Sequence, residues 1–558
     1  MSIATGSIVA ARVAPAASRP SPRARAPTAA RAVPARRSAR LSANLATPFS
    51  RPSRSARPRA TSSELAERAS SSARAGPSSP DDATPADRLE SIDDDRLFCS
   101  VDADDGFTRE PASMGGAIAL VAGTTVGAGM LALPAVCQDS GFVPSTVALV
   151  GCWLYMVTTG LLVLEVNINT MRATGSDAVS VSSMAGRTLG PLGVNFAWTA
   201  YVFIHYALLV AYISRSGEIV SDALGGAVSS STAAIAYAAA LGGFMFLAES
   251  SRLEAVNSAL VVVVLGTFAP LLAIAAAGAN PENFLTGDWS AVPNTIPVIA
   301  LAFVFHNVVP TVSSMMEGDG RRARTAVVAG TAIPFAMFVL WDAALLGNVS
   351  AADAAAALDA VARSGGAVEA ISDPLVALRA TSEPANALVE AFSFFAISTS
   401  FIGFVLGLTD FLADGLGWQA PEKGKKDPRT FALALVPPTV FALSYPDIFL
   451  SALDSAGTFG VLTLFGCLPP LMAWSDRYGL PWDSTAAEEG ATEVGAAEGF
   501  PAEGGAERVP MGKLAPEDRT EPLVPGGKAA LAAVFAFAGS VVLSESVEKL
   551  GTLIFDRQ

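Results

Sequence analysis

Residues 115–137 read GGAIALVAGTTVGAGMLALPAVC, and this stretch decides the fold of the chain. It is apolar and long enough to cross a bilayer core about 30 Å thick, which takes roughly 20 helical residues. Its centre, GTTVGAG, is poor helix material because glycine costs about 1 kcal/mol against alanine inside a helix. Pro134 also removes a backbone donor near the far end. The stretch therefore predicts a broken spanning helix.

Backbone that leaves a helix at membrane depth is tolerated only against protein or a water-filled cavity. Such a break exposes N–H groups and the end of a half-helix dipole, and both favour an anionic group of a bound molecule. The break is therefore interpreted as part of a binding site. A tightly packed helix contact is the alternative, because small residues also serve helix packing.

Composition points to a membrane protein and excludes several classes of function. The 558 residues are 51% hydrophobic, and the mean hydropathy is +0.44. A formal charge of −14 argues against nucleic acid as a partner. The four cysteines are scattered without metal-site spacing, and no phosphate-binding loop is present. We therefore expect no enzyme, no metal and no cofactor; the expected partners are the bilayer, a small substrate and protons.

Two segments of the chain have compositions typical of targeting and disorder. Residues 1–63 contain no Asp or Glu and are rich in Arg, Ser and Ala, which predicts an organelle transit peptide cleaved near residues 55–75. A disordered basic arm is the alternative. The Ser and Ala content favours a chloroplast membrane, with the inner envelope first, over the mitochondrial inner membrane. Residues 64–113 are expected to be a disordered acidic tail.

Ten more apolar stretches follow the first. Their approximate ranges are 143–168, 194–213, 232–248, 255–277, 296–316, 326–346, 387–412, 431–445, 448–474 and 529–543. They predict an all-α polytopic membrane protein of about eleven transmembrane helices. Its core is expected at 114–475, a disordered acidic loop at 476–527, the last helix at 528–548 and a tail at 549–558. The excess of Lys and Arg in alternate loops places the N-terminus inside.

The sixth stretch repeats the irregularity of the first. It reads IPVIALAFVFHNVVPTVSSMM, and His306, Asn307 and Pro310 interrupt its middle. Breaks in spans one and six predict two inverted five-helix repeats, with the binding site between them. A proline kink is the alternative, because such kinks are common in membrane helices.

GTTVGAGMLALP in the first stretch and AFVFHNVVPTVSS in the sixth resemble the tryptophan/tyrosine permease family. This is the hydroxy and aromatic amino acid branch of the amino acid–polyamine–organocation superfamily, and the resemblance covers residues 114–474 and the last span. It implies eleven spans, a five-plus-five inverted repeat, and proton-coupled symport of tyrosine or tryptophan. The chain with its long N-terminal leader resembles plastid-directed plant and algal members of the family. Alternatives are another neutral amino acid, sodium coupling, or a channel or amino acid sensor on the same scaffold.

Candidate substrate residues lie mainly in the two breaks. The carboxylate is expected on the backbone and hydroxyls of the first break, that is on Gly123, Thr124, Thr125, Val126, Gly127, Ala128 and Gly129. The amine is expected on free carbonyls at Phe305 and His306 and on the side chain of Asn307. Tyr206, in the third stretch, is expected to contact the substrate as well.

Candidate coupling residues are ionisable groups inside apolar stretches, which are functional candidates by default. For the proton these are Asp342, Glu165, His306 and His205. A buried histidine that only satisfies a hydrogen bond is the alternative for both imidazoles. Ser398 and Thr399 in the eighth stretch keep sodium coupling open as a minor option, and hydroxyls that serve helix packing are the alternative.

Overall fold

The first apolar stretch folds as two helices, α3 (Met114–Thr125) and α4 (Gly129–Cys137), which meet at an angle of 53°. The Ser113 hydroxyl caps α3 by accepting a hydrogen bond from the N–H of Gly116 at 3.1 Å. Residues 126–128, in the middle of the glycine-rich run, lie between the two helices. The predicted break is present.

The computed structural model describes residues 113–175, 179–348, 375, 378–379, 382–416, 418, 426–445, 448–479, 514 and 518–555. All of these belong to the second of two units, Glu90–Gln558. The expected transit peptide and, apart from Ser113, the expected acidic tail lie outside the described residues, and so do most residues of the loops at 349–381 and 480–517.

Helices make up the rest of the described fold, which contains no β-strand. In chain order they are α5 (Phe142–Thr174), α6 (Val181–Ala223), α7 (Ser230–Leu247), α8 (Ser250–Gly278), η2 (Pro281–Leu285), η3 (Trp289–Ala291), α9 (Val292–Ala302), η4 (His306–Val308), α10 (Val309–Met315), α11 (Gly320–Leu346), α14 (Glu383–Leu416), α15 (Pro428–Ser444), α16 (Phe449–Ser455), the π-helical η6 (Ala456–Cys467), α17 (Leu468–Tyr478) and α19 (Gly527–Phe555).

The chain is an all-helical, multi-pass membrane protein. Within the described residues nine spans are long and apolar enough to cross a membrane, and the bent pair α3–α4 makes a tenth. The ninth predicted stretch corresponds to α15, which has 17 residues and contains Pro437 and Pro438, so it is short for a crossing. The count of eleven and the inverted repeat stay predictions.

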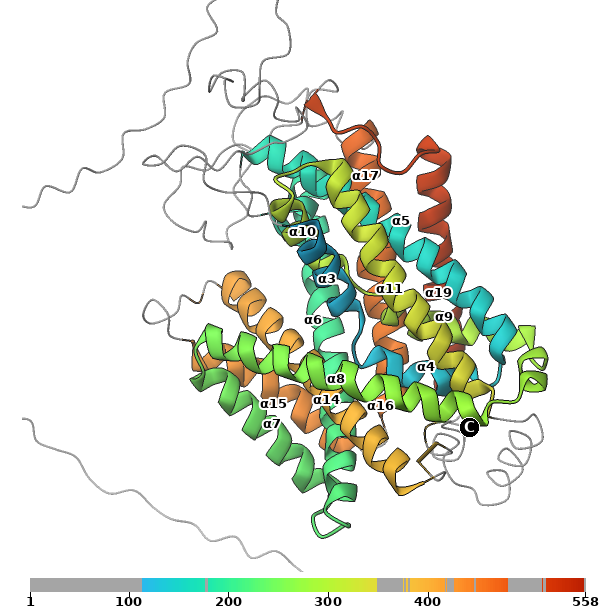
Figure 1. The fold of residues 1–558 in the computed structure, drawn as a ribbon. Coiled ribbons are helices and arrows are strands. Elements are labelled where there is room, and N and C mark those ends of the chain that lie inside the picture. Colours follow the sequence, from blue (N-terminus) through green and yellow to red (C-terminus); the bar gives the residue numbers. More distant parts are fainter. Residues whose placement is uncertain are drawn as a thin grey trace, which may run out of the picture. The chain divides into compact units, whose positions relative to one another are not determined.

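The helices pack in two groups, which can be followed in Figure 1. One group contains both broken stretches: α3, α4, α5, α9, α10 and α11 contact one another. The other contains α6, α7, α14 and α15. We call the face where α3, α6 and α11 begin and α5, α10 and α17 end the N-terminal face (Figure 1). α14 ends towards the same face, because it runs antiparallel to α6: Phe411 stacks on Tyr201, and Phe404 contacts Tyr212.

Small residues let the broken helices approach their neighbours closely. A Cβ atom added at Gly330 of α11 would lie 2.6 Å from the Cβ of Val121 in α3. A Cβ atom added at Gly129 would lie 3.1 Å from the Cα of Ala302, so α4 and α9 touch through their backbones. Glycine and alanine at these positions therefore bring the two breaks together.

The chain before the last span differs from the expectation of disorder over 476–527. α17 continues to Tyr478, and residues 518–526 lie against the N-terminal face before α19 begins at Gly527 (Figure 1). The N–H of Thr520 donates to the Asn169 side chain at 2.8 Å, and the N–H of Leu523 donates to Glu165 at 2.8 Å. Acceptors supplied by α5 order this polar segment, and its composition alone does not reveal them.

Candidate substrate-binding site

The first break leaves the backbone donor of Gly127 open. The N–H of Val126 donates to Ala122 O at 2.9 Å, and the N–H of Ala128 donates to the Ser400 hydroxyl at 3.1 Å. Within the described chain the N–H of Gly127 makes no hydrogen bond. Thr124 and Thr125 turn their hydroxyls back to Leu120 O and Val121 O, both at 2.8 Å. The donor available to a ligand is thus the backbone and not the threonine hydroxyls.

Ser400 of α14 closes the first break from the other group of helices. A Cβ atom added at Gly127 would lie 2.8 Å from Ser400 Oγ, which is tighter than ordinary contact. The two neighbouring hydroxyls point elsewhere: Ser398 accepts from Tyr237 of α7 at 3.3 Å, and Thr399 donates to Ala396 O at 2.9 Å. Ser400, which the sequence did not single out above its neighbours, is therefore the α14 residue at the break.

In the second break, the carbonyls that accept no hydrogen bond lie two residues earlier in the chain than expected. The carbonyls of Phe305 and His306 accept turn hydrogen bonds from Val308 (3.0 Å) and Val309. Those of Phe303 and Val304 accept none in the described chain. Asn307 is exposed although it lies in the middle of a spanning stretch. Free acceptors are therefore present, but at Phe303 and Val304 instead of Phe305 and His306.

The two breaks present opposite dipole ends side by side. α4 starts at Gly129, and α9 ends at Ala302, against which Gly129 packs. The N-terminus of a helix carries partial positive charge and the C-terminus partial negative charge. A zwitterion that holds a carboxylate and an ammonium a few ångströms apart matches this pair of ends.

His306 is buried away from the exposed side of the break. Its ring is stacked between Phe305 and Phe465 of η6, with centroids 4.7 Å away in both cases. Its Nε2 pairs with the Thr159 hydroxyl of α5 at 2.9 Å, and Thr159 also reaches Met156 O at 3.1 Å. The Thr159 hydroxyl thus links Nε2 to Met156 O, whereas the buried Nδ1 has no hydrogen-bond partner in the described chain. His306 thus anchors η4 to α5 while its neighbour Asn307 faces outward.

Tyr206 and His205 take part in packing instead of lining a break. The Tyr206 hydroxyl donates to Leu433 O in α15 at 2.8 Å. That carbonyl would normally accept from residue 437, but Pro437 has no N–H to give. His205 Nδ1 pairs with Tyr201 O at 2.7 Å, and its ring stacks on Tyr201 against α14. Neither residue reaches a break.

The two candidate carboxyls differ in their surroundings. Glu165 forms a two-pronged ion pair with Arg477, with both N–O distances 2.6 Å. Asp342 of α11 is fully buried beside the Cys137 thiol, and neither of its oxygens has another partner in the described chain. A carboxyl without a partner is costly to bury as an anion, which suits a group that takes up and releases a proton. The paired Glu165 does not suit that role.

Comparison with known proteins agrees with the motifs. The sequence pattern of the tryptophan/tyrosine permease family matches residues 110–487, a range that holds both breaks. The chain is 32% identical over 370 residues to tyrosine-specific transport system 2 of Haemophilus influenzae, covering 65% of this chain and 87% of that protein. It is 28% identical over 389 residues to the tryptophan-specific transport protein of the same organism (67% and 90%). It is 25% identical over 356 residues to the low affinity tryptophan permease of Escherichia coli K12 (61% and 82%). These relatives are transport proteins and not enzymes, and this chain belongs to the tryptophan/tyrosine permease family.

Proposed function

We propose that the protein is a secondary active transporter of aromatic amino acids that binds its substrate between the two breaks. The observation that carries the proposal is the contact of Gly129 with Ala302, which sets the start of α4 beside the end of α9. The Gly127 N–H and the α4 N-terminus would hold the carboxylate. The carbonyls of Phe303 and Val304, with Asn307, would hold the ammonium.

The preference for an aromatic side chain rests on the relatives, whose names specify tyrosine and tryptophan. The backbone groups of the breaks recognise the part that all amino acids share. Another neutral amino acid is therefore the comparison that an uptake experiment must include.

Two rows of polar or small residues, one on η4 and α10 and one on α14, run from the breaks towards the N-terminal face. On α10 and η4, Asn307 and Thr311 are exposed and Ser314 is half-buried, at spacings of four and three residues. On α14, Gly403 and Asp410 are exposed at positions that follow Ser400 with helical spacing. Polar faces on spanning helices turn towards protein or water and not towards lipid. We propose that these faces line the route by which substrate leaves the site.

Proton coupling is assigned to Asp342. Its carboxyl lies on α11 against the end of α4, so a change in its charge acts on the same half-helix that begins at the carboxylate site. Ser398 and Thr399 make bonds to protein groups, which leaves them less suited to hold sodium.

The decisive experiment is uptake of labelled tyrosine, tryptophan, phenylalanine and leucine by the purified protein in liposomes, under a pH gradient, a sodium gradient or neither. We expect accumulation of an aromatic amino acid that needs the pH gradient and is abolished by a protonophore. Asp342→Asn should exchange substrate across the membrane but lose gradient-driven accumulation. No uptake of any aromatic amino acid under any gradient would contradict the proposal.

The proposed site of action is a chloroplast membrane, with the inner envelope first. Its support is the acid-free, Arg- and Ser-rich composition of residues 1–63. These residues fused to a fluorescent protein should deliver it to chloroplasts. Delivery to mitochondria would contradict the location and leave the transport proposal intact.

A further inference from the structure

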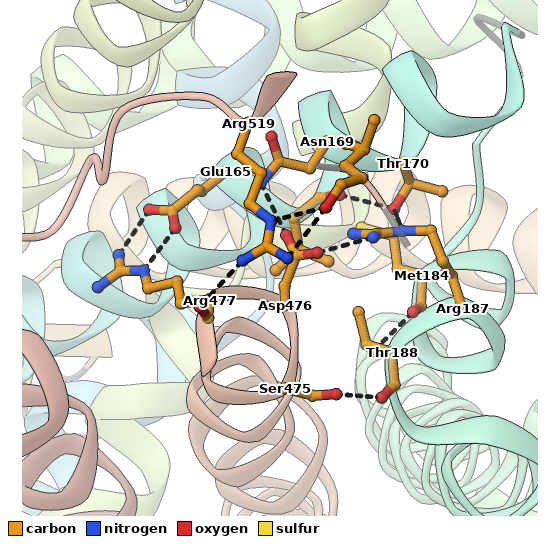
Figure 2. Close-up of polar contacts among 12 residues, drawn as sticks. Glu165, Asn169, Thr170, Met184, Arg187, Thr188, Ser475, Asp476, Arg477 and Arg519 are labelled. Carbon is orange, nitrogen blue, oxygen red and sulfur yellow. Dashed lines mark hydrogen bonds and ion pairs between the residues drawn. The ribbon is translucent and has the colours of Figure 1, made fainter. Parts of the chain in front are cut away.

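A buried polar cluster joins α5, α6 and α17 to the segment 518–524, here called the strap (Figure 2). Its first node is the pair Glu165–Arg477. The Arg477 side chain is 8% exposed and that of Glu165 is 1% exposed, and their two hydrogen bonds are both 2.6 Å long. Two parallel bonds of this kind fix geometry as well as adding energy. The node joins the end of α5 to the end of α17.

The second node of the cluster is Asp476, one residue before Arg477. Its Oδ2 accepts from Asn169 of α5 at 2.7 Å, and its Oδ1 accepts from Arg187 of α6 at 2.7 Å. Arg187 also donates from Nε to Thr170 of α5 at 2.9 Å. This node ties α5, α6 and α17 to one another, as Figure 2 shows.

The strap is bound to both nodes through its backbone. The Thr520 N–H donates to Asn169 Oδ1 at 2.8 Å, and the Leu523 N–H donates to Glu165 Oε2 at 2.8 Å. Arg477 donates to Val524 O at 3.2 Å. Carboxylate and amide groups that pair the helices thus also hold the strap, and the strap could not leave without removing partners from buried charges.

The boundary between the broken helices and α14 is built differently. One contact there is a neutral hydrogen bond from the N–H of Ala128 to the Ser400 hydroxyl, and the positions that follow along that face of α14 are Gly403, Gly407 and Asp410. Breaking this neutral hydrogen bond leaves no charge unpaired. Breaking a buried ion pair leaves two charges unpaired in an environment without water, which is strongly unfavourable.

We propose that the strap and the ends of α5, α6 and α17 form one rigid block that stays assembled throughout transport. The N-terminal face then opens on the other side, between α10 and α14. The inference rests on the proposed function, since it concerns how a carrier changes access. It also gives Glu165 a role: this carboxylate holds the block together and does not carry the proton.

The test uses cross-links in the full-length protein with Cys99, Cys137, Cys152 and Cys467 replaced by alanine. Asn169→Cys with Thr520→Cys, joined by a short bis-methanethiosulfonate that forms a reducible disulfide with each thiol and releases methanesulfinate, ties the strap to α5. Thr311→Cys with Gly403→Cys, joined by a longer reducible reagent, ties α10 to α14 as the matched pair. Exchange of labelled tyrosine or tryptophan is measured per protein molecule before cross-linking, after it, and after reduction.

Cross-linking within the block should change exchange by less than about twofold, whereas the α10–α14 link should lower it at least about tenfold and reversibly. A reversible tenfold loss at residues 169 and 520 would overturn the proposal, because the cluster would then have to open in each cycle.

Absence of exchange before any cross-link would contradict the proposed function instead. In that case the rate of thiol labelling, which needs no substrate, tests whether the block stays assembled. Thr520→Cys should label at least about tenfold more slowly than Gly403→Cys, since the Thr520 hydroxyl is buried and Gly403 is exposed. Equal labelling rates would overturn the block.

Discussion

At the residue scale, the proposed carboxylate site centres on Gly127. Its N–H is open and its missing side chain leaves room for Ser400, because an added Cβ would lie 2.8 Å from the serine oxygen. A charge-assisted hydrogen bond is worth about 1.5–3 kcal/mol, and each 1.4 kcal/mol is tenfold in affinity. The group that would bind the carboxylate is a backbone N–H, and a motif of side chains does not reveal which backbone N–H is open.

Gly127→Ala should therefore weaken tyrosine or tryptophan binding by at least about tenfold while the protein stays folded, as measured by ligand binding and by thermal unfolding. Adding Ser400→Ala should restore part of the affinity, because it removes the atom that the new methyl group meets. Gly151→Ala is the matched control, since nothing lies within 4 Å of its added Cβ. Wild-type affinity in Gly127→Ala would show that this break does not hold the carboxylate.

We propose that His306 positions Asn307 by anchoring η4 to α5 through Thr159. Thr159→Val keeps the shape but leaves the buried Nε2 without its partner, at a cost of about 1–3 kcal/mol. We expect a KM at least about tenfold higher, with recovery in Thr159→Ser. The half-buried neighbour Thr158, whose hydroxyl donates within its own helix to Leu154 O at 2.7 Å, gives the control Thr158→Val. An unchanged KM in Thr159→Val would mean that the anchor does not set the site.

At the scale of elements, much of the arrangement could be predicted from sequence. The glycine run and the His-Asn-x-x-Pro segment located both breaks, because glycine and proline disturb helices in any surroundings. The choice of Ser400 among three adjacent hydroxyls could not be predicted, since it depends on the rotation of α14. The pairing of Glu165 with Arg477, 312 residues apart, could not be predicted either, and without it Glu165 resembles a proton carrier.

The contact of α6 with α15 supplies a prediction at this scale. Tyr206→Phe removes the hydroxyl that serves the carbonyl freed by Pro437. We expect stability to fall by about 1 kcal/mol, read as a lower unfolding temperature in detergent, with the KM for substrate unchanged. A raised KM at unchanged stability would instead favour the direct substrate contact that the sequence suggested for Tyr206.

At the scale of the whole molecule, two packed groups of helices meet at the breaks, and α14 contributes Ser400 from the second group. The proposed rigid block lies at the N-terminal face, where α5 and α6 belong to different groups. The two groups of helices would then rotate relative to each other about the block. Their displacement would be largest at the substrate site and at the boundary between α10 and α14. A substrate bound at the breaks would touch both groups and could couple its own binding to that movement.

The central claim is that the two breaks bind the charged ends of an aromatic amino acid. Its most direct test is competition against uptake of labelled tyrosine by unlabelled tyrosine, by tyramine, which lacks the carboxylate, and by 3-(4-hydroxyphenyl)propionate, which lacks the amine. Loss of two charge-assisted bonds at either end should weaken competition by roughly a hundredfold or more. Replacing the ring, as in phenylalanine or tryptophan, should matter far less. Competition by tyramine or the propionate that equals that of tyrosine would contradict the account.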